Sequence, residues 1–528
     1  MAKIFNTAGA CFSDVHYMVD ITERLQVIES MVCQGDYFTI NRGRQYGKTT
    51  TLAALADFLS CDYQIISLDF QLLSRADYAN EASFVSAFSR EILIASASLE
   101  IPDGNKKKLE LYARNKSHGD GLPELFALLS DWCRQSAKPI VLMVDEVDEA
   151  SNNEVFLDFL SQLRGYYIHR RVRPTFQSVI LTGVYDIKNL KRKFVSESEH
   201  QINSPWNIAV NFSMNMDFSS VQIAAMLQEY EKNYYTGMDI SVISEMIYDY
   251  TSGYPVLVSA ICKIIDEQLA GTDRFPIKTD AWTVAGVNEA VRQLMRQPIP
   301  LFDSMIKQIL QYSELKEMLM RILFEGDKLT FNQYNSALSL GMMFGYIKNT
   351  DNQVAVANRI FEMQLYNYFL SEEDMSSQTF REAQNDKNQF LKNGRLDMDL
   401  LIRKFVIHFC NVYGDNDQKF IEKYGRKLFL LYLKPVINGT GNYYVEAQTR
   451  DSKRTDIVVD YRGEQFVIET KLWYGNKYQE NGERQLCGYL DRFHLQKGYL
   501  VTFSFKKDKV IGVEEKMVDG KVLVEAVV

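Results

Sequence analysis

Short apolar runs alternate with segments of helical spacing over the first 217 residues of the chain. Runs of about four to eight residues, bounded by polar residues, are typical of strands buried on both faces of a parallel sheet. The predicted strands cover residues 37–40, 63–70, 139–145, 176–183 and 206–212. Because helical segments separate these strands, the pattern predicts an α/β fold with a parallel sheet.

The middle of the chain changes to helical spacing. Residues 218–285 predict a helical lid, in which Gly253 can end one helix and Pro255 can begin the next. Within residues 286–370, further helices are followed by the order helix, strand, turn, strand, helix, which suits a winged helix. Winged helices bind DNA in some proteins and are structural in others, so this fold alone does not decide the function. A lysine-rich polar stretch at 105–120 predicts an exposed loop.

The pattern changes again toward the C-terminus. Residues 371–399 are polar and charged and predict a linker or a solvated helix. Residues 400–528 then give a long helical region, three strand-like segments, a helix and a further strand. The predicted domains are 1–217, 218–285, 286–370, the linker 371–399, and 400–528.

Composition is that of a globular protein. Of the 528 residues, 46% are hydrophobic and 24% are charged, which allows several buried cores. We find no apolar signal segment at the N-terminus and no uninterrupted run of about 18 apolar residues, so we expect a cytoplasmic protein without a membrane span. The seven cysteines form no C-x-x-C pair, and the six histidines have no metal-ligand spacing.

Charge is distributed unevenly along the chain. The net charge of −9 argues against a protein coated for nucleic acid. Residues 401–528 carry 21 Lys and Arg against 17 Asp and Glu, a net charge of +4, which leaves −13 on the first 400 residues. A nucleic-acid contact would therefore sit more comfortably on the C-terminal part.

The loop after the first predicted strand carries the first chemical motif, Asn41-Arg42-Gly43-Arg44-Gln45-Tyr46-Gly47-Lys48-Thr49-Thr50. Backbone N–H groups of such a loop, and of the helix that follows, converge on one point and favour a phosphate. Lys48 would reach the β- and γ-phosphates, and Thr49 would hold Mg²⁺. Arg42 stands where the usual G-x-x-x-x-G-K-[ST] pattern has glycine, and Gly43 is one place late. A chance Gly-Lys-Thr at a helix start is the alternative.

The third predicted strand supplies an acidic partner for this loop. Asp145 falls at its C-terminal end, where parallel sheets bind ligands, and can hold the Mg²⁺ of a nucleotide. Glu146 can orient or deprotonate the attacking water, whereas we expect Asp148 to be solvated. Thr182 ends the next strand, where it either senses the γ-phosphate or forms a simple Thr-Gly turn. The sequence does not choose among the candidate arginine fingers, Arg164, Arg170, Arg171 and Arg173.

A second constellation lies in the C-terminal part, where Asp456 precedes Glu469-Thr470-Lys471. The strand period of two puts Glu469 and Lys471 on one face, and a neighbouring antiparallel strand can bring Asp456 beside them. Two carboxylates with a lysine form the minimum set for a Mg²⁺-dependent nuclease. The carboxylates hold the metal, and the lysine positions or activates water. Ordinary alternation of charges on an exposed strand is the alternative.

Further polar residues extend this second constellation. Glu446 on the preceding strand and Glu422 on the helix are candidate additional metal ligands. Gln485 and Tyr489 are four residues apart and share one helix face, from which they could contact the site or a nucleic-acid backbone.

With both constellations in view, the chain resembles a family of mostly bacterial proteins that join an AAA-like, STAND-related P-loop ATPase to a C-terminal PD-(D/E)xK nuclease-like domain. The resemblance covers nearly the whole chain. Apart from the two constellations, it is carried by Tyr17-Met18-Val19-Asp20, Ser204-Pro205-Trp206-Asn207-Ile208-Ala209-Val210 and Gly253-Tyr254-Pro255. An arginine-rich phosphate loop is usual in that family. Thr455 replaces the proline of the family's name, and Thr470 stands where an apolar residue is common.

The resemblance implies a P-loop ATPase sheet with a helical lid and a winged helix, followed by a restriction-endonuclease-like α/β domain. It implies binding of ATP and Mg²⁺, with hydrolysis assisted by Glu146, and a nuclease site at Asp456, Glu469 and Lys471. The predicted nucleotide-binding residues are Arg42, Gly43, Tyr46, Gly47, Lys48, Thr49, Thr50, Asp145 and Thr182. The predicted metal ligands are Thr49, Asp145, Asp456, Glu469 and Glu446.

Two functional hypotheses follow. In the first, an intracellular ATPase controls a Mg²⁺-dependent DNase, in mobile-element or defence biology. In the second, the protein is a nucleotide-switched scaffold whose nuclease-like domain holds nucleic acid or protein without cutting. DNA is the expected partner of the C-terminal domain, and a homo-oligomer is left open.

Overall fold

The computed structural model describes residues 3–114, 121–148, 150–151, 153–184, 206–325, 329–374, 379, 383–384, 386–413, 418–437, 441–448, 454–472, 476–504 and 509–528. In some of these stretches, among them 444–448 and 454–456, only the backbone is described. The chain divides into two compact units. The first comprises Met1–Tyr248, Gly253–Lys263 and Met343–Gly345, and the second comprises Asp249–Ser252, Ile264–Met342 and Tyr346–Val528. The predicted domain boundaries stay predictions.

The first unit is built on a five-stranded sheet with the order β2-β3-β4-β1-β5, in which all neighbours are parallel. Its strands are β1 (Tyr37–Asn41), β2 (Gln64–Asp69), β3 (Ile140–Asp145), β4 (Ser178–Gly183) and β5 (Val210–Asn211). Every residue of β3 and β4 is buried, as the continuous apolar runs predict. The predicted fifth strand is wrong in length, because the N–H of Ala209 bonds to the carbonyl of Trp206 and this turn delays the pairing with β1.

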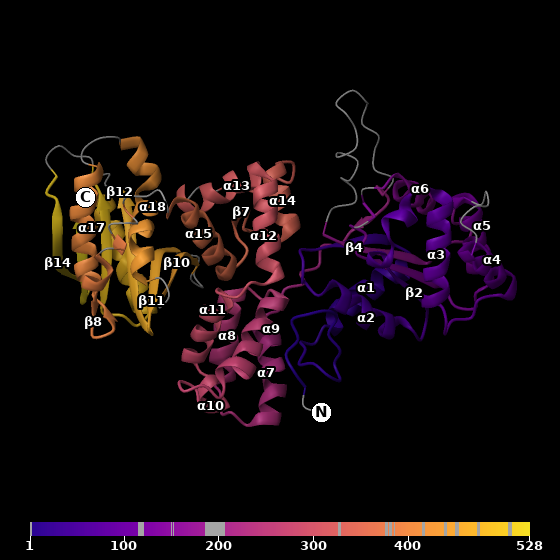
Figure 1. Cartoon of the computed structure of the whole chain (residues 1–528), viewed down its shortest axis with the longest axis horizontal. Helices are drawn as coiled ribbons and strands as arrows, with labels where there is room; N and C mark the ends of the chain where they lie inside the picture. The colour runs from indigo at the N-terminus through magenta and orange to yellow at the C-terminus, as the bar shows by residue number, and fades with distance from the viewer. Residues whose placement is uncertain are drawn as a thin grey trace. The chain divides into compact units, whose positions relative to one another are not determined.

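Helices cover both faces of this sheet (Figure 1). Phenylalanines and leucines of α3, α5 and α6 form a single buried cluster with β1 to β4 on one face. Buried side chains of α1 and α2 cover the other face. The bounds are α1 (Thr22–Gln34), α2 (Lys48–Leu59), α3 (Glu81–Ala95), α4 (Asp103–Arg114), α5 (Leu122–Gln135) and α6 (Glu154–Ile168), with 3₁₀ turns at Phe70–Leu72 and Arg75–Tyr78.

Helix α4 corrects the prediction of an exposed loop at 105–120. Its lysines are exposed, but Leu109 is buried, and the Asn105 side chain donates a hydrogen bond of 3.0 Å to the Leu128 carbonyl of α5. One buried leucine and one buried amide therefore fix a helix that is polar on its other faces. Residues 115–120 lie outside the described part of the chain.

A helical segment follows the sheet. It contains α7 (Ser220–Tyr234), α8 (Ile240–Thr251) and α9 (Pro255–Lys263). Gly253 has a φ of +78°, and α9 begins at Pro255, so the predicted corner is confirmed. A Cβ atom at Gly253 would lie 1.9 Å from the carbonyl oxygen of Phe218, so only glycine fits there.

The second unit begins with helices and a hairpin. The helical elements are a π-helix at Ile264–Leu269, α10 (Lys278–Ala281), α11 (Val284–Leu294), α12 (Pro300–Gln311), α13 (Ser313–Met320), a π-helix at Arg321–Glu325, α14 (Ser336–Phe344) and α15 (Arg359–Asp374). The strands β6 (Ile347–Thr350) and β7 (Gln353–Val356) pair antiparallel between α14 and α15. This is the predicted order of elements, while the winged-helix interpretation stays a proposal.

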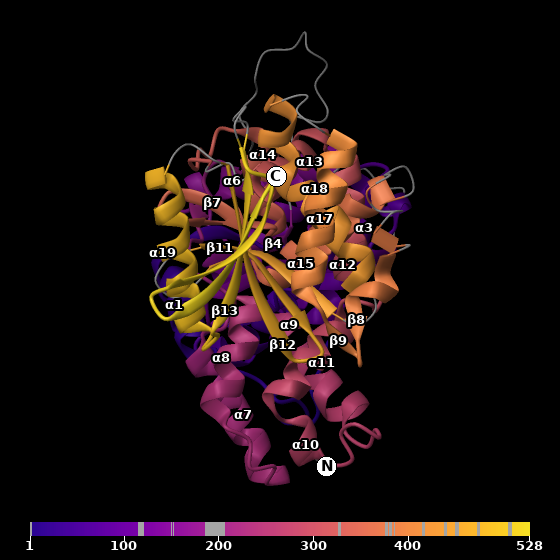
Figure 2. The ribbon, with the colours of Figure 1, turned by 90° about the vertical axis from the view of Figure 1, so that its left-hand side faces the viewer.

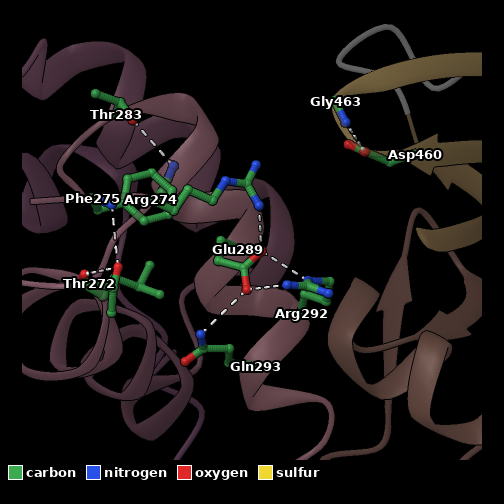
Figure 3. A network of polar contacts seen from close by, with 11 residues as sticks. Thr272, Arg274, Phe275, Thr283, Glu289, Arg292, Gln293, Asp460 and Gly463 are labelled. Atoms are coloured by element: carbon green, nitrogen blue, oxygen red, sulfur yellow. Dashed lines mark hydrogen bonds and ion pairs between the residues drawn. The ribbon is translucent and has the colours of Figure 1, made fainter. Parts of the chain in front are cut away.

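A buried acid organises part of this helical region. Glu289 of α11 accepts hydrogen bonds from Arg274 at 3.1 Å, from Arg292 Nε at 2.9 Å and from Gln293 at 3.3 Å (Figure 3). Two guanidinium groups compensate the negative charge of this buried carboxylate, so no ligand is needed to stabilise it. We therefore treat this cluster as structural.

The C-terminal part of the second unit is a six-stranded mixed sheet with the order β10-β11-β12-β13-β15-β14. Helix α19 covers one face, and α17 and α18 cover the other (Figure 2). The bounds are α17 (Met398–Tyr413), α18 (Gln418–Ile437), β10 (Gly441–Gln448), β11 (Arg454–Tyr461), β12 (Glu464–Leu472), α19 (Asn476–Arg492), β13 (Lys497–Phe503), β14 (Gly512–Val518) and β15 (Lys521–Val527).

Two features of this region differ from the prediction. The predicted linker 371–399 contains the end of α15, a 3₁₀ turn (Lys387–Phe390) and the short hairpin β8 (Leu391–Lys392) and β9 (Arg395–Leu396). The antiparallel strands β14 and β15 follow the last predicted strand. Within the described residues, no helix combines the length and the apolar character needed to cross a bilayer.

Candidate functional site

The loop between β1 and α2 has the backbone shape that its glycines predict. Gly47 is left-handed, with a φ of +78°, and Gln45 has a φ of +58°. Helix α2 starts immediately afterwards at Lys48, so its free N–H groups lie at the carboxyl edge of the sheet. Gly43 is required for a steric reason, because a Cβ atom there would lie 2.5 Å from the carbonyl oxygen of Phe344. The glycine that is one place late in the motif is thus explained by packing.

Lys48 is folded into this loop. Its side chain is buried (6% exposed), and Nζ donates hydrogen bonds to the carbonyls of Arg42 at 3.1 Å and Gly43 at 3.2 Å. Burial lowers the pKa of Lys48, and the charges of Glu146 and Asp148 oppose that shift. A buried cation held only by neutral carbonyls attracts an anion, since phosphate oxygens are stronger acceptors.

Asp145 is the centre of the acidic part of the site. Its carboxylate is buried (6% exposed) at the end of β3 and accepts a hydrogen bond of 2.6 Å from Thr49 Oγ1. The hydroxyl of Thr182, at the end of the neighbouring strand β4, donates to the other carboxylate oxygen, as does the N–H of Glu146 at 2.9 Å. Three elements far apart in the sequence therefore converge on one carboxylate, and Thr49 is exposed on its open side.

Glu146 lies beside this carboxylate in an unusual conformation. Its φ of +51° is rare for a residue other than glycine, and such strain is concentrated at functional sites. Burial raises the pKa of Glu146, while the positive charges of Lys48 and Arg44 lower it and Asp145 raises it further. The geometry thus gives a partly buried carboxylate between two cations and another acid.

Arg42 and Tyr46 turn away from Lys48, toward the segment 214–218. Arg42 donates to the carbonyls of Asn41, at 2.8 Å, and of Met214. The Tyr46 hydroxyl donates to Asp217 at 2.7 Å. These two residues contact the protein, although the sequence assigns them to the nucleotide.

A pocket of about 740 Å³, which includes space open to solvent, adjoins the loop. Thr50, whose hydroxyl accepts a hydrogen bond of 3.0 Å from the N–H of Cys11, contributes to its wall together with Gly47. The N-terminal segment around Tyr17 and the start of α9 at Pro255 complete the lining. The loop therefore ends beside a cavity that is open to solvent.

The arginines at the end of α6 lie elsewhere. Arg170 donates to the carbonyl of Gly35, which precedes β1, so it sits at the amino edge of the sheet. Arg173 stacks over the ring of Tyr166 at 5.6 Å. Because Asp145 lies at the opposite, carboxyl edge, these two arginines do not reach the loop of the same chain. Arg164 and Arg171 belong to the same helix end and gain no contact with the loop in the described part of the chain.

The second constellation is centred on Glu469 of β12. Its side chain is fully buried (0% exposed), and Lys471 Nζ lies 2.8 Å from Glu469 Oε1. Lys471 also donates to Gln485 Oε1 at 3.3 Å, and Gln485 Nε2 donates to the Tyr489 hydroxyl at 2.8 Å. The structure thus joins Glu469, Lys471, Gln485 and Tyr489 in one chain of polar contacts between β12 and α19.

Thr502 of β13 adds a polar atom to this face. It pairs in parallel register with Lys471, so the two side chains share a face of the sheet. Thr502 is fully buried (0% exposed), and its hydroxyl has no hydrogen-bond partner among the described residues. A buried hydroxyl without a partner is energetically costly. The sequence signal, a threonine in an apolar strand, was too weak to single it out.

The side chains of Asp456 and Glu446 lie outside the described part of the structure. Their backbones belong to β11 and β10. Asp456 directly precedes Ile457, whose Cα partner on β12 is Ile468, the residue before Glu469. The backbone therefore brings Asp456 and Glu469 onto neighbouring strands. Among the residues whose side chains are described, no three His, Cys, Asp or Glu groups form a metal-binding cluster.

Three further residues shape the first site. Asp148, predicted to be solvated, accepts a hydrogen bond of 2.5 Å from the N–H of Val184, just after β4. Tyr254 donates from its hydroxyl to the carbonyl of Arg44 at 2.6 Å. Asp217 faces Tyr46, as described above. Tyr254 stood in a motif that indicates only a corner, and nothing in the sequence around Asp217 marks it.

The chain is similar to a known protein family and to several solved structures. Residues 12–372 match the protein family described as an AAA-like domain. No curated protein matches the chain. Among solved structures, the chain is similar to a Walker-type ATPase of Pyrococcus abyssi, with 14% identity, a TM-score of 0.46, and coverage of 68% of this chain and 99% of that chain.

Two proteins of Aeropyrum pernix are also similar. Its ORC2 protein, in ADPNP-ADP complexes, is 12% identical with a TM-score of 0.39, and the match covers 67% of this chain and 94% of that one. Its ORC1 protein, in complex with DNA, is 12% identical with a TM-score of 0.31, and the coverage is again 67% and 94%.

Proposed function

The chain belongs to the AAA-like domain family, and from that premise we propose that it binds and hydrolyses ATP at the loop between β1 and α2. The observation that carries the proposal is the convergence of Thr49, Asp145 and Thr182 beside Lys48. These groups come from α2, β3 and β4. No single packing requirement explains why two hydroxyls from different elements converge on one buried carboxylate, with a buried lysine in the neighbouring loop.

Lys48 and the start of α2 hold the phosphates in this proposal. The ammonium group leaves the carbonyls of Arg42 and Gly43 for the β- and γ-phosphates, which are charged acceptors. The N–H groups at the start of α2 and the helix dipole favour the same negative charge. Because Lys48 is already buried, binding requires little further desolvation of its charge.

Thr49 and Asp145 fit Mg²⁺. One hydroxyl and one carboxylate, 2.6 Å apart at the open side of the site, are the oxygen donors that this ion prefers. When bound, the metal would neutralise charge on the phosphates. Thr182 holds Asp145 in place and lies where it can respond to the γ-phosphate.

Glu146 is the proposed residue that orients the attacking water. Its carboxylate is next to Asp145, and its raised pKa makes it a better proton acceptor than an exposed glutamate. The nucleoside would occupy the adjoining pocket of about 740 Å³. Tyr46 also lines that pocket, while its hydroxyl and the Arg42 side chain bind the protein.

Glu146→Gln tests the hydrolysis step. The substitution keeps the size of the side chain and its strained backbone but removes the base, so we expect ATP binding within about threefold of wild type and turnover reduced by about 100-fold or more. Isothermal titration calorimetry and phosphate release measure the two quantities. Glu154→Gln, at the start of α6, is the matched control. Unchanged turnover in Glu146→Gln would remove Glu146 from the mechanism.

For the second unit, we propose a Mg²⁺-dependent DNA nuclease whose activity the ATPase controls, in mobile-element or defence biology. Support comes from the fully buried Glu469, its contact with Lys471, and the link to Gln485 and Tyr489. A glutamate on an ordinary solvated strand would be exposed, so burial favours a site over simple charge alternation. Asp456 and Glu446 complete the proposed metal ligands, and Gln485 and Tyr489 would contact DNA.

The competing proposal is a nucleotide-switched scaffold that holds nucleic acid or protein without cutting it. The contact of 2.8 Å between Lys471 and Glu469 favours it, because the lysine already neutralises the carboxylate that a metal would need. A homo-oligomer would suit either proposal.

Cleavage assays on several DNA forms, with Mg²⁺ or Mn²⁺ and with or without ATP, separate the two proposals. Cleavage that is lost in Lys471→Ala but kept in Lys307→Ala, an exposed lysine of α12, supports the nuclease, provided that ATP turnover is retained. No cleavage of any form under any of these conditions leaves the scaffold.

A further inference from the structure

Three side chains of the first unit grip the segment that leads from the sheet into α7. We name residues 214–218 the strap. Arg42 donates to the carbonyl of Met214, Arg24 donates to that of Met216 at 2.9 Å, and Tyr46 donates to the Asp217 carboxylate at 2.7 Å. Two of these three side chains, those of Arg42 and Tyr46, belong to the phosphate loop. The loop and the strap are therefore connected by hydrogen bonds.

The other end of the same helical segment is tied to the loop as well. Tyr254, in the turn before α9, donates to the Arg44 carbonyl at 2.6 Å. Its ring packs on that of Tyr46, with centroids 4.3 Å apart and an angle of 59° between the planes. The turn and the strap also meet directly, through a hydrogen bond of 2.8 Å from the N–H of Phe218 to the carbonyl of Gly253.

Charge supports this junction. Burial lowers the pKa of Arg24 to about 10, and Asp217 opposes the shift. Burial likewise lowers the pKa of Arg42, which Asp217 also opposes. The negative charge of Asp217 therefore favours the charged forms of both guanidinium groups, and its carboxylate accepts the hydrogen bond from Tyr46.

The loop carbonyls show what the junction does. Three consecutive carbonyls, those of Arg42, Gly43 and Arg44, accept hydrogen bonds from side chains: the first two from Lys48 and the third from Tyr254. Carbonyls that are held on one side leave the loop's N–H groups to the other side, where a phosphate binds. When a phosphate draws Lys48 away, the hydrogen bond from Tyr254 to the Arg44 carbonyl remains.

We propose that Tyr254, supported by Tyr46 and Asp217, positions the phosphate loop and couples the binding of a nucleotide's β- and γ-phosphates to the strap and the turn before α9. This rests on the proposed ATP binding at the same loop. Tyr254 and Tyr46 are positioning residues, because they act on the loop backbone and not on the nucleotide. The coupling concerns only the β- and γ-phosphates. A nucleoside monophosphate lacks both, so its affinity does not depend on the coupling.

Binding of ATP and of AMP to Tyr254→Phe tests this inference. Phenylalanine keeps the ring packing but removes the donor, so we expect affinity for ATP to fall about three- to tenfold, the effect of one hydrogen bond, with affinity for AMP unchanged. Tyr46→Phe should act in the same direction, and the two losses should not add in the double variant. Tyr235→Phe, an exposed tyrosine at the end of α7, is the matched control.

The outcomes separate this inference from the proposed function. Two outcomes for Tyr254→Phe would overturn the proposed coupling and leave the ATP site in place, provided that Lys48→Ala abolishes ATP binding. One is an equal loss of affinity for ATP and AMP, and the other is no loss of affinity for either. Absence of ATP binding in the wild type would overturn both. Thermal melting checks that each variant is folded, and Asp217→Asn, which keeps both rings, replaces any tyrosine variant that is not.

Discussion

Each of the two candidate sites contains a buried carboxylate and a lysine, but the contacts of the two carboxylates differ. At the phosphate loop, hydroxyls and an N–H hold Asp145, while Lys48 binds backbone carbonyls. On the C-terminal sheet, Lys471 contacts Glu469 directly at 2.8 Å. The first carboxylate keeps its negative charge available, and the second is neutralised by its own neighbour.

The difference sets how readily each site accepts a cation. Neutral donors orient Asp145 without cancelling its charge, so a metal that arrives with a polyphosphate adds to the existing contacts. A cation at Glu469 must instead displace an ammonium group from a buried carboxylate. The first site is therefore ready for its ligand, whereas a cation can bind at the second only if Lys471 rearranges.

The scaffold of the first site offers the largest effect. Gly253→Ala places a Cβ atom 1.9 Å from the carbonyl of Phe218 at a φ of +78°, so both backbones must move. We expect a loss of more than about 4 kcal/mol in the free energy of unfolding. Gly237→Ala is the matched control, because its φ of +72° is similar but its Cβ would meet nothing within 4 Å. Equal losses in urea unfolding of the two variants would show that the strap contact is not tight.

Replacing each lysine by methionine compares the two sites directly. Lys471→Met leaves Glu469 buried without its cation, and we expect a loss of about 3 kcal/mol. Lys48→Met removes a buried cation that has no carboxylate partner at hydrogen-bond distance among the described residues, so the stability of this variant should stay within about 1 kcal/mol of wild type. Denaturant unfolding measures both variants. Glu469→Gln combined with Lys471→Met should recover most of the loss, and equal effects of the two single substitutions would erase the distinction between the sites.

The pH dependence of turnover sharpens the account of the first site. Burial raises the pKa of Glu146, so this carboxylate takes up a proton at a higher pH than an ordinary glutamate. Since a base must be deprotonated, turnover should fall by about tenfold per pH unit below that raised pKa. The residual turnover of Glu146→Gln should lack this acid limb. An acid limb with the same midpoint in Glu146→Gln would contradict the assignment.

The smallest effect is expected at Thr502. Thr502→Val removes a fully buried hydroxyl without a partner among the described residues, so it should raise the free energy of unfolding by about 1 kcal/mol. If that hydroxyl holds water or a metal-bound group at the proposed nuclease site, DNA cleavage falls although stability rises. Thr470→Val, on the opposite face of β12, should leave cleavage unchanged. A more stable Thr502→Val variant with full cleavage would make Thr502 irrelevant to the site.

The sequence predicts what local pattern encodes. Uninterrupted apolar runs mark β3 and β4 because both faces of these strands are buried, and Asp145 follows from its place at a strand end. Polar surfaces are predicted less well. Helix α4 has three exposed lysines in succession, which predict a loop, but the buried residues Leu109 and Asn105 hold it as a helix. Strand β14 lies at the sheet edge and carries exposed charges such as Glu514. Its apolar and polar residues therefore do not alternate in the pattern that predicts a strand.

The contacts that shape the first site have no local signal. Tyr46 and Asp217 are 171 residues apart, and Arg44 and Tyr254 are 210 apart. The side chains of Arg42 and Tyr46 contact the strap, which the loop motif does not predict, while the role of these two residues in nucleotide binding stays a prediction. A phosphate-loop motif predicts the backbone, the lysine and the hydroxyl, whereas the direction of the remaining side chains depends on distant segments.

The most direct test of the central claim is ATP binding by the wild type and by Lys48→Ala. Titration calorimetry with Mg²⁺ should show one ATP site in the wild type and an affinity at least about 100-fold lower in Lys48→Ala, because a buried charged partner of the phosphates is lost. Lys107→Ala, an exposed lysine of α4, should bind as the wild type does. Equal affinity of Lys48→Ala and wild type, or no binding by either, would contradict the account.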